Sequence, residues 1–212
     1  KFIGDADRRV KEDYLRILRY LRFFINYSKK PHNLKIIRIL KINISGVLKL
    51  SRERLLDELK KILKLETLEI ISKDTLSLEL ILMIFPELKN IKIFSRLNVK
   101  NRDILKENDF IFLLSLIIID GTDNTDYFLY KYNISKKDQK RIKIIDNFYK
   151  EKINSKTFTE NNMNKFFYYY GKKVTLDILN HKIIKSKKVD NSLKVLVKHY
   201  ENSAVPTMPV SA

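Results

Sequence analysis

The sequence of 212 residues contains no cysteine and only four glycines and four prolines. Without cysteine the chain forms no disulfide and no thiolate metal site, which fits a reducing compartment, so we expect a cytoplasmic protein. The scarcity of glycine and proline argues against a β-sandwich or a sheet built on glycine-rich turns. Apolar residues recur mostly with helical spacing, and we therefore predict an all-α protein.

The chain also lacks a long apolar run. Its most hydrophobic stretch, residues 110–119, has ten residues, whereas a membrane-spanning helix needs about 20. We predict a buried core helix there and no membrane association. No secretion signal is recognisable either.

Acidic residues are few compared with basic ones. The chain has 43 Lys and Arg against 25 Asp and Glu, a formal net charge of +18. This excess predicts a polyanionic partner such as RNA, because each cation placed on a phosphate releases counterions. The alternative is compositional drift, since Lys, Ile, Asn, Phe and Tyr are abundant together, as in AT-rich coding sequences. We favour nucleic acid binding.

Residues 2–27 predict one amphipathic helix with two distinct faces. The apolar face should pack against the rest of the chain and consists of Val10, Tyr14, Ile17, Leu18, Leu21, Phe24 and Ile25. The opposite face brings together carboxylates, guanidinium groups and rings, namely Arg9, Glu12, Asp13, Arg16, Tyr20 and Phe23. Such a combination is unusual for a face that merely solubilises a helix.

The polar groups of that second face suit recognition of a nucleotide base. Asp13 only accepts hydrogen bonds, Arg16 only donates them, and Glu12 is placed to orient the Arg16 guanidinium. An acceptor beside a donor matches the amino group and ring nitrogen of cytosine and adenine. Guanine and uracil would leave buried groups unpaired, at about 1 to 3 kcal/mol each. The alternative is a solvated face with one ordinary ion pair.

Residues 3–19, IGDADRRVKEDYLRILR, resemble the neck of the class II tRNA nucleotidyltransferases, the family of CCA-adding enzymes and bacterial poly(A) polymerases. The template motif of that family reads EDxxR, and Glu12, Asp13 and Arg16 match it. The resemblance implies that Asp13 and Arg16 pair with the base of incoming CTP or ATP, with Glu12 and Arg9 beside them. It does not separate CCA addition from poly(A) synthesis.

Weaker similarities to the same family continue along the chain. Residues 51–59 resemble its SxERIxxEL neck helix, residues 85–88 match its FPEL turn, residues 132–142 are similar to LSNxERKRL, and residues 170–179 resemble YRxGxxxxxDxxLL. Residues 206–212 resemble the start of its last tail element. The resemblance implies an elongated, multi-helix protein with a neck and the start of a body at 1–95, an RNA-binding body and tail at 96–205, and a truncated tail element at 206–212.

The resemblance implies tRNA as the macromolecular partner. Basic residues that we expect to contact RNA are Arg52, Arg54, Lys136, Lys137, Lys140 and Arg141. A solvated charged face is the alternative for each of them.

Asp5 and Asp7 form a carboxylate pair of the kind that binds Mg²⁺. They stand directly before a predicted helix, however, where carboxylates cap exposed N–H groups, so we predict no metal ligand in this chain. The resemblance implies that Mg²⁺ binds a catalytic head that this sequence does not contain. Because the chain starts at Lys1, we expect an internal fragment that is inactive alone, with the head in the same protein or in a separate chain.

Other local patterns give further expectations. We predict a helix at 34–44 that Gly46 breaks, an N-cap at Ser51, and two short helices within 65–90. The aromatic run 166–170 is predicted to lie mostly in the core. His32, His181 and His199 are expected to be isolated, neither ligands nor catalytic bases.

A second hypothesis is a basic, all-helical RNA-binding or scaffold protein without a nucleotide site. No repeat of 30 to 45 residues supports it. Binding of CTP or ATP at Asp13 and Arg16 would distinguish the two hypotheses.

Overall fold

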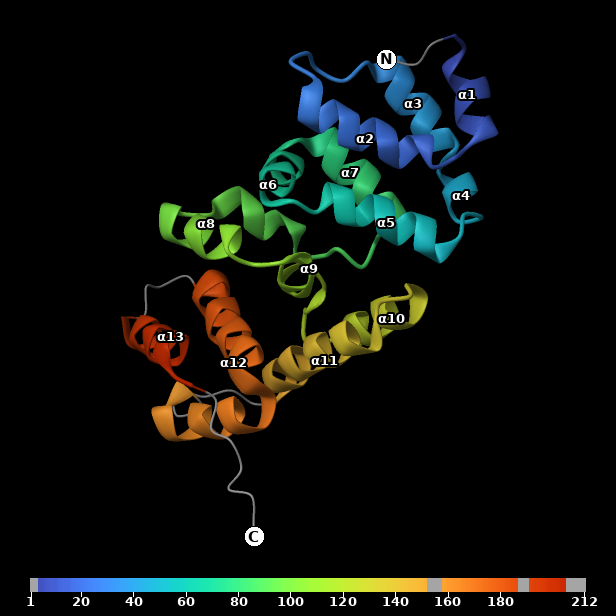
Figure 1. Ribbon diagram of the computed structural model, residues 1–212. Helices are drawn as coiled ribbons and strands as arrows, with labels where there is room; N and C mark the ends of the chain where they lie inside the picture. The colour runs from blue at the N-terminus through green and yellow to red at the C-terminus, as the bar shows by residue number, and fades with distance from the viewer. Residues whose placement is uncertain (1–3, 152–157, 187–190, 205–212) are drawn as a thin grey trace.

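The computed structural model describes residues 4–151, 158–186 and 191–204 (Figure 1). Within these ranges every regular element is a helix, which confirms the all-α prediction. The tail element predicted at 206–212 lies outside the described residues. None of the described helices is both long and apolar enough to span a membrane.

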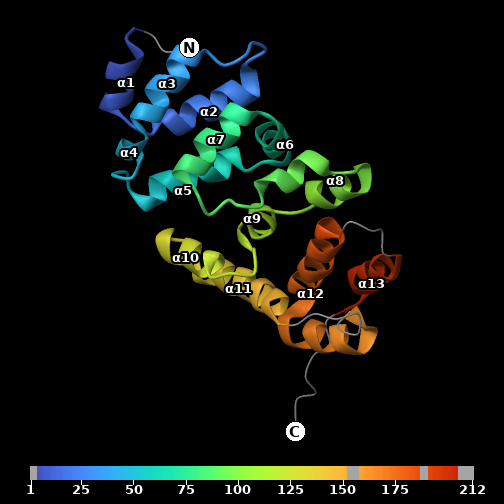
Figure 2. The ribbon, with the colours of Figure 1, turned by 180° about the vertical axis from the view of Figure 1, so that it is seen from behind.

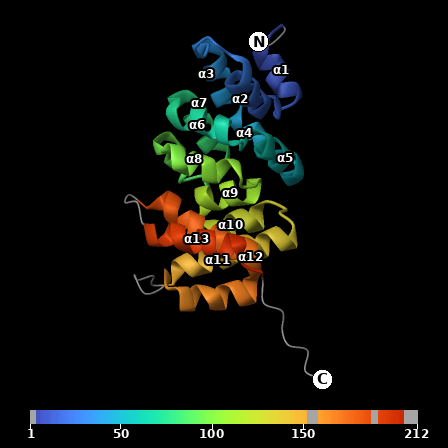
Figure 3. The same ribbon diagram turned by 60° about the vertical axis from the view of Figure 1, so that its left-hand side comes forward.

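The first seven helices are α1 (Ala6–Glu12), α2 (Arg16–Tyr27), α3 (Leu34–Ile42), α4 (Ile44–Val47), α5 (Arg52–Ile62), α6 (Leu65–Lys73) and α7 (Thr75–Ile84). They are followed by the 3-10 helix η1 (Ile91–Arg96), α8 (Val99–Lys106), α9 (Phe110–Ile118), α10 (Asn124–Lys131), α11 (Lys136–Lys150), α12 (Glu160–Lys185) and α13 (Asn191–Asn202). Figure 3 shows them stacked in tiers along one axis, from α1 to α7 at one end to α11 to α13 at the other. The same order is seen from behind in Figure 2, and the molecule is elongated as predicted.

The amphipathic stretch at the N-terminus forms two helices, so the prediction of one continuous helix is wrong. The break falls at Asp13, which has extended backbone angles (φ −154°, ψ 103°). Its carboxylate accepts a hydrogen bond from the Leu15 N–H at 3.2 Å. A short polar side chain that binds a backbone N–H two residues on competes with helical hydrogen bonding, which explains the interruption.

The predicted apolar face survives this break. Val10, Ile17, Leu18, Leu21 and Ile25 are buried, and Tyr14 and Phe24 are partly buried against the same core. The face works across the break because α1 packs against α3 while α2 packs against α5 and α6, and α1 and α2 also contact each other. The stretch therefore organises this end of the molecule as the pattern indicates.

Gly46 has a different role from the predicted one. It lies inside the short helix α4, and the separation from α3 occurs at Asn43. A Cβ atom on Gly46 would overlap the ring of Tyr14. The glycine is needed for close approach of α4 to the α1–α2 junction, and it does not break a helix.

Several other local predictions are confirmed. Ser51 caps α5, accepting a hydrogen bond from the Arg54 N–H at 3.4 Å. The predicted pair of short helices corresponds to α6 and α7, with Pro86 just beyond the second. The predicted core helix is α9, in which Ile111 to Ile118 are all buried.

The long helix α12 is kinked at Gly171, which has φ 76°. The aromatic run before the kink is less buried than predicted. Phe167 is in the core and Phe166 is partly buried against it, but Tyr169 and Tyr170 are 72% and 43% exposed. Consecutive residues on a helix point in different directions, so a run of rings cannot be buried together.

Candidate functional site

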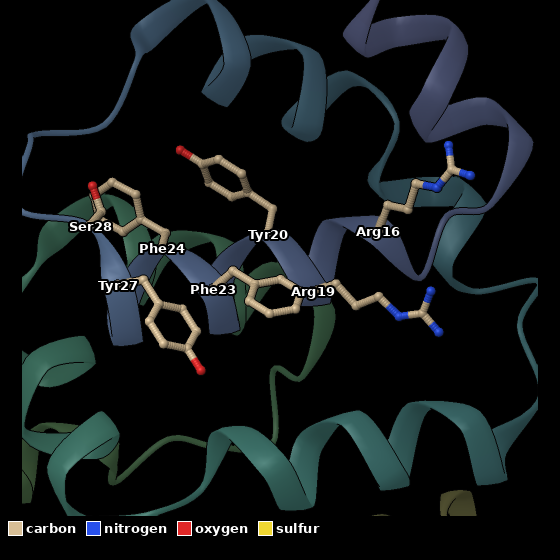
Figure 4. Close-up of a pocket in the computed structure, with 7 residues that line it drawn as sticks. All are labelled: Arg16, Arg19, Tyr20, Phe23, Phe24, Tyr27 and Ser28. Atoms are coloured by element: carbon tan, nitrogen blue, oxygen red, sulfur yellow. The ribbon is translucent and has the colours of Figure 1, made fainter. Parts of the chain in front are cut away.

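A pocket with a volume of about 700 Å³ lies along α2. Its lining residues are Arg16, Arg19, Tyr20, Phe23, Phe24, Tyr27 and Ser28. They recur every three or four residues, so they share one side of the helix. Figure 4 shows the two guanidinium groups at one end and Tyr27 and Ser28 at the other. The pocket thus has a cationic end and an aromatic end.

The Arg16 guanidinium is held by the helix before it. Its Nη1 donates to Glu12 Oε2 at 2.9 Å and to the Arg9 carbonyl at 2.7 Å. Arg9 Nη1 donates to the same Glu12 oxygen at 3.1 Å. These hydrogen bonds, first from Arg9 and then from Arg16, lower the pKa of Glu12 below its ordinary value. Among the described residues, Nε and Nη2 of Arg16 have no hydrogen-bond partner.

Asp13 is held by different partners. Its Oδ1 accepts a hydrogen bond from Arg54 Nη2 at 3.0 Å, and Arg19 Nη1 lies 3.6 Å from its Oδ2. Asp13 and Arg16 therefore form no ion pair with each other in the described part of the chain. Each is oriented separately, the acid by α5 and the guanidinium by α1. The sequence placed them on one face but could not show this division.

A buried carboxylate on α5, Glu58, binds arginine side chains of α2. The Glu58 side chain is 3% exposed and accepts hydrogen bonds from Arg22 Nε at 3.0 Å and Lys61 Nζ at 3.1 Å. Arg19 Nε lies 3.7 Å from the same group. Burial by itself would raise the pKa of Glu58, but the hydrogen bonds from Lys61 and Arg22 outweigh it and the pKa is lowered.

Arg19 and Glu58 were missed by sequence reasoning. The burial of Glu58 could have been predicted, because its spacing places it on the apolar face of α5, with Leu55, Leu59 and Ile62. A carboxylate in such a stripe indicates a buried partner of opposite charge. Nothing in the sequence indicated which cations it would meet.

His32 is not isolated, contrary to expectation. Its Nδ1 lies 3.0 Å from the Tyr20 hydroxyl and its Nε2 lies 2.8 Å from Asp74 Oδ2. The ring stacks on Phe24 with 3.5 Å between centroids. Burial, with a smaller contribution from Asp74, raises the pKa of Tyr20 to about 12. These contacts fix two rings of the pocket wall, and sequence could not reveal them because Asp74 is 42 residues from His32.

The residues expected to contact RNA have divergent environments. Lys136, Lys137 and Lys140 are exposed on α11. Arg52 is exposed and donates to the Tyr130 carbonyl at 3.4 Å. Arg54 is the partner of Asp13, which places it with the predicted nucleotide residues instead of a separate RNA surface.

Arg141 differs most from its predicted setting. Its side chain is 13% exposed, and the guanidinium donates to both oxygens of Asp177, at 2.6 and 3.1 Å, and to Asp109 at 2.6 Å. Asp177 has no exposed side-chain surface. Arg141 therefore joins α11 to α12 and to the start of α9, so its predicted RNA contact would require these bonds to open.

Asp5, directly before α1, acts as the predicted cap, whereas Asp7 lies within the first turn of the helix and binds other side chains. Asp5 accepts a hydrogen bond from the Arg8 N–H at 2.7 Å and caps the helix. Asp7 accepts from Lys11 at 2.6 Å and from Asn43 at 2.8 Å. In the part of the chain that the structure describes, no three His, Asp or Glu side chains gather as a metal site would require.

The fold and the pocket define a basic, all-helical protein with a pocket of guanidinium groups and rings on its second helix. One segment of 65 residues is homologous to CCA tRNA nucleotidyltransferases. It is 45% identical to "CCA tRNA nucleotidyltransferase 1, mitochondrial" of Homo sapiens, 43% to the protein of the same name in Mus musculus and 42% to that of Danio rerio. The segment makes up 30% of this chain and 15% of each relative. No family model matches the chain.

Proposed function

We propose that this chain is the nucleotide-selecting and RNA-binding part of a CCA tRNA nucleotidyltransferase, an enzyme that adds CMP and AMP from CTP and ATP to tRNA 3′ ends. The observation that carries the proposal is the separate anchoring of Asp13 by Arg54 and of Arg16 by Glu12. An acceptor and a donor held independently form a template that does not collapse into an internal ion pair. The names of the relatives favour CCA addition over poly(A) synthesis.

Base selection then follows from hydrogen-bond chemistry. The unused Nε and Nη2 of Arg16 donate to the ring nitrogen of cytosine or adenine, and Asp13 Oδ2 accepts from the amino group. Uracil and guanine present a carbonyl to Asp13 and an N–H to Arg16, which leaves both pairs unsatisfied. Tyr20 and Phe23, on the same side of α2, offer ring faces for stacking.

The tRNA would lie along the basic surface of the body. Lys136, Lys137 and Lys140 are exposed there and suit phosphate contacts, which depend on salt.

The described residues do not supply a Mg²⁺ site. We therefore assign Mg²⁺ and the transfer chemistry to a catalytic head of the complete enzyme, in the same protein or in a partner chain.

Nucleotide titration of the chain tests the proposal. Amide NMR shifts of α2 should respond to CTP and ATP, with UTP and GTP weaker by about tenfold or more, as one or two unpaired groups imply. Asp13→Ala should abolish most of that preference. Asp103→Ala removes an exposed carboxylate on α8, paired with Lys106 at 3.6 Å, and should change nothing.

Two results would reject the proposal. One is an unchanged preference in Asp13→Ala. The other is RNA binding without any response of α2 to nucleotides, which would support the basic RNA-binding or scaffold protein instead. In the complete enzyme, Asp13→Ala should lose discrimination against UTP and GTP more than it loses rate in a nucleotide-competition assay.

A further inference from the structure

A second pocket, with a volume of about 790 Å³, lies between η1, the α9–α10 turn and the last turns of α12. It shares no lining residue with the pocket on α2. Its charged and titratable lining residues include Lys89, Lys92, Arg96, Asp120, His181 and Lys185. A cavity of this size is typical of small-molecule sites, which run from about 300 to 1,000 Å³.

The charges in this pocket do not balance. Lys89 is neutralised by Asp120, its Nζ lying 2.9 Å from the carboxylate. Lys92 and Arg96 are exposed at the rim and have no ion-pair partner in the described ranges. Two cations with no partner on one short helix favour a bound anion.

A third cation, Lys185, is partly buried in the wall of the pocket. Lys185 Nζ donates to the Ile119 carbonyl at 2.6 Å. Burial lowers the pKa of Lys185 to about 8, with Asp120 and Asp146 opposing the shift. An anion in the pocket would help this lysine keep its proton.

His181 lies in the wall of the pocket and is fully buried. No well-formed hydrogen bond reaches either ring nitrogen from the described residues, although the Ser115 backbone approaches the ring. Burial first, and then the charge of Lys185, lowers the pKa of His181 well below its usual value. A buried polar group left without a good partner costs about 1 to 3 kcal/mol. A ligand that displaces the neighbouring Tyr149 ring, 4.6 Å from the imidazole between centroids, would give His181 a partner.

We propose that this pocket binds a small phosphate-bearing anion of mononucleotide size, with Lys92 and Arg96 on the phosphate and His181 facing the organic part. The volume of the pocket and the imidazole in its wall favour a small ligand over the backbone of an RNA strand, which exposed cations alone could bind. This inference does not rest on the function proposed for α2.

The test uses 5′-AMP and inorganic phosphate as probes of the whole chain. NMR shifts of the His181 ring and the Gly121 amide report on this pocket and are independent of α2. AMP should give saturable shifts, with phosphate binding more weakly. The double variant Lys92→Ala/Arg96→Ala should weaken AMP binding by at least about tenfold. The double variant Lys136→Ala/Lys137→Ala removes the same charge from α11 and should leave it unchanged.

A third arm uses a single-stranded RNA oligonucleotide. Shifts at His181 with RNA but none with AMP would overturn the proposal and assign the surface to a polymer. Absence of saturable shifts at millimolar AMP, or equal weakening in both double variants, would overturn it as well. The substituted residues are exposed, and circular dichroism melting verifies that both variants remain folded.

Discussion

Arg54 of α5 donates a hydrogen bond to Asp13 at 3.0 Å, across 41 residues of sequence. Asp13 stands where the first helix ends and the second has not begun. Its carboxylate also accepts a hydrogen bond from the Leu15 N–H at 3.2 Å, and the bond from Arg54 ties it to α5. The cross-helix bond gives it one orientation, so α5 controls the acceptor of the proposed template.

Arg54→Ala should therefore change nucleotide preference more than stability. The ion pair is partly exposed, 48% at Arg54 and 24% at Asp13, and such pairs contribute about 1 kcal/mol or less. We expect a small shift in the urea midpoint but reduced preference for CTP and ATP over UTP and GTP in the α2 titration. Arg52→Ala, two residues earlier on α5, is the matched control. Equal nucleotide preference in wild type and Arg54→Ala would contradict a positioning role.

Gly46→Ala should destabilise the protein. In a helix such as α4 this substitution usually stabilises by about 0.5 to 1 kcal/mol. Here the added methyl group would overlap the Tyr14 ring, and overpacking costs about 1 to 3 kcal/mol. Denaturant unfolding measures whether the free energy of unfolding falls or rises in Gly46→Ala. In a Tyr14→Ala background the overlap is gone, so Gly46→Ala should then be neutral or stabilising; destabilisation of equal size there would disprove the steric cause.

Lys185 should make stability rise with pH above about 8. Its pKa is about 8 in the folded chain against 10.5 ordinarily, so between these values the unfolded chain binds more protons and alkali favours folding. Below pH 8 the folded and the unfolded chain both keep the proton, so Lys185 no longer contributes to the pH dependence of the free energy of unfolding. From pH 8 to 9.5 we expect a gain of about 1.5 kcal/mol relative to Lys185→Met, which lacks the titrating group. Parallel pH profiles of wild type and variant would refute the shift.

Sequence reasoning succeeded where neighbouring residues decide the outcome. The caps at Asp5 and Ser51 were predictable because a capping side chain binds N–H groups within one turn. The core helix α9 was predictable from its composition. The break at Asp13 was missed because helical periodicity continues across it, although an aspartate that binds a nearby N–H is a known competitor of helix formation.

The candidate site was only partly accessible from sequence. The EDxxR residues and the rings of α2 were singled out, and the structure brings Arg16, Tyr20 and Phe23 to one pocket. Arg19, Glu58 and the Tyr20–His32–Asp74 contacts were not anticipated. Their partners come from other helices, and no periodic pattern specifies which charges will meet across an interface.

By itself, the sequence determined the all-helical class, the caps at Asp5 and Ser51 and the apolar face of the first two helices, because these depend on spacings of one to four residues. The tertiary structure decided that Arg54 binds Asp13, that Arg141 pairs with Asp177, and that the Tyr14 ring packs against Gly46. Each of these contacts joins residues 32 to 41 positions apart. Only the packing of whole helices brings such residues within bonding distance.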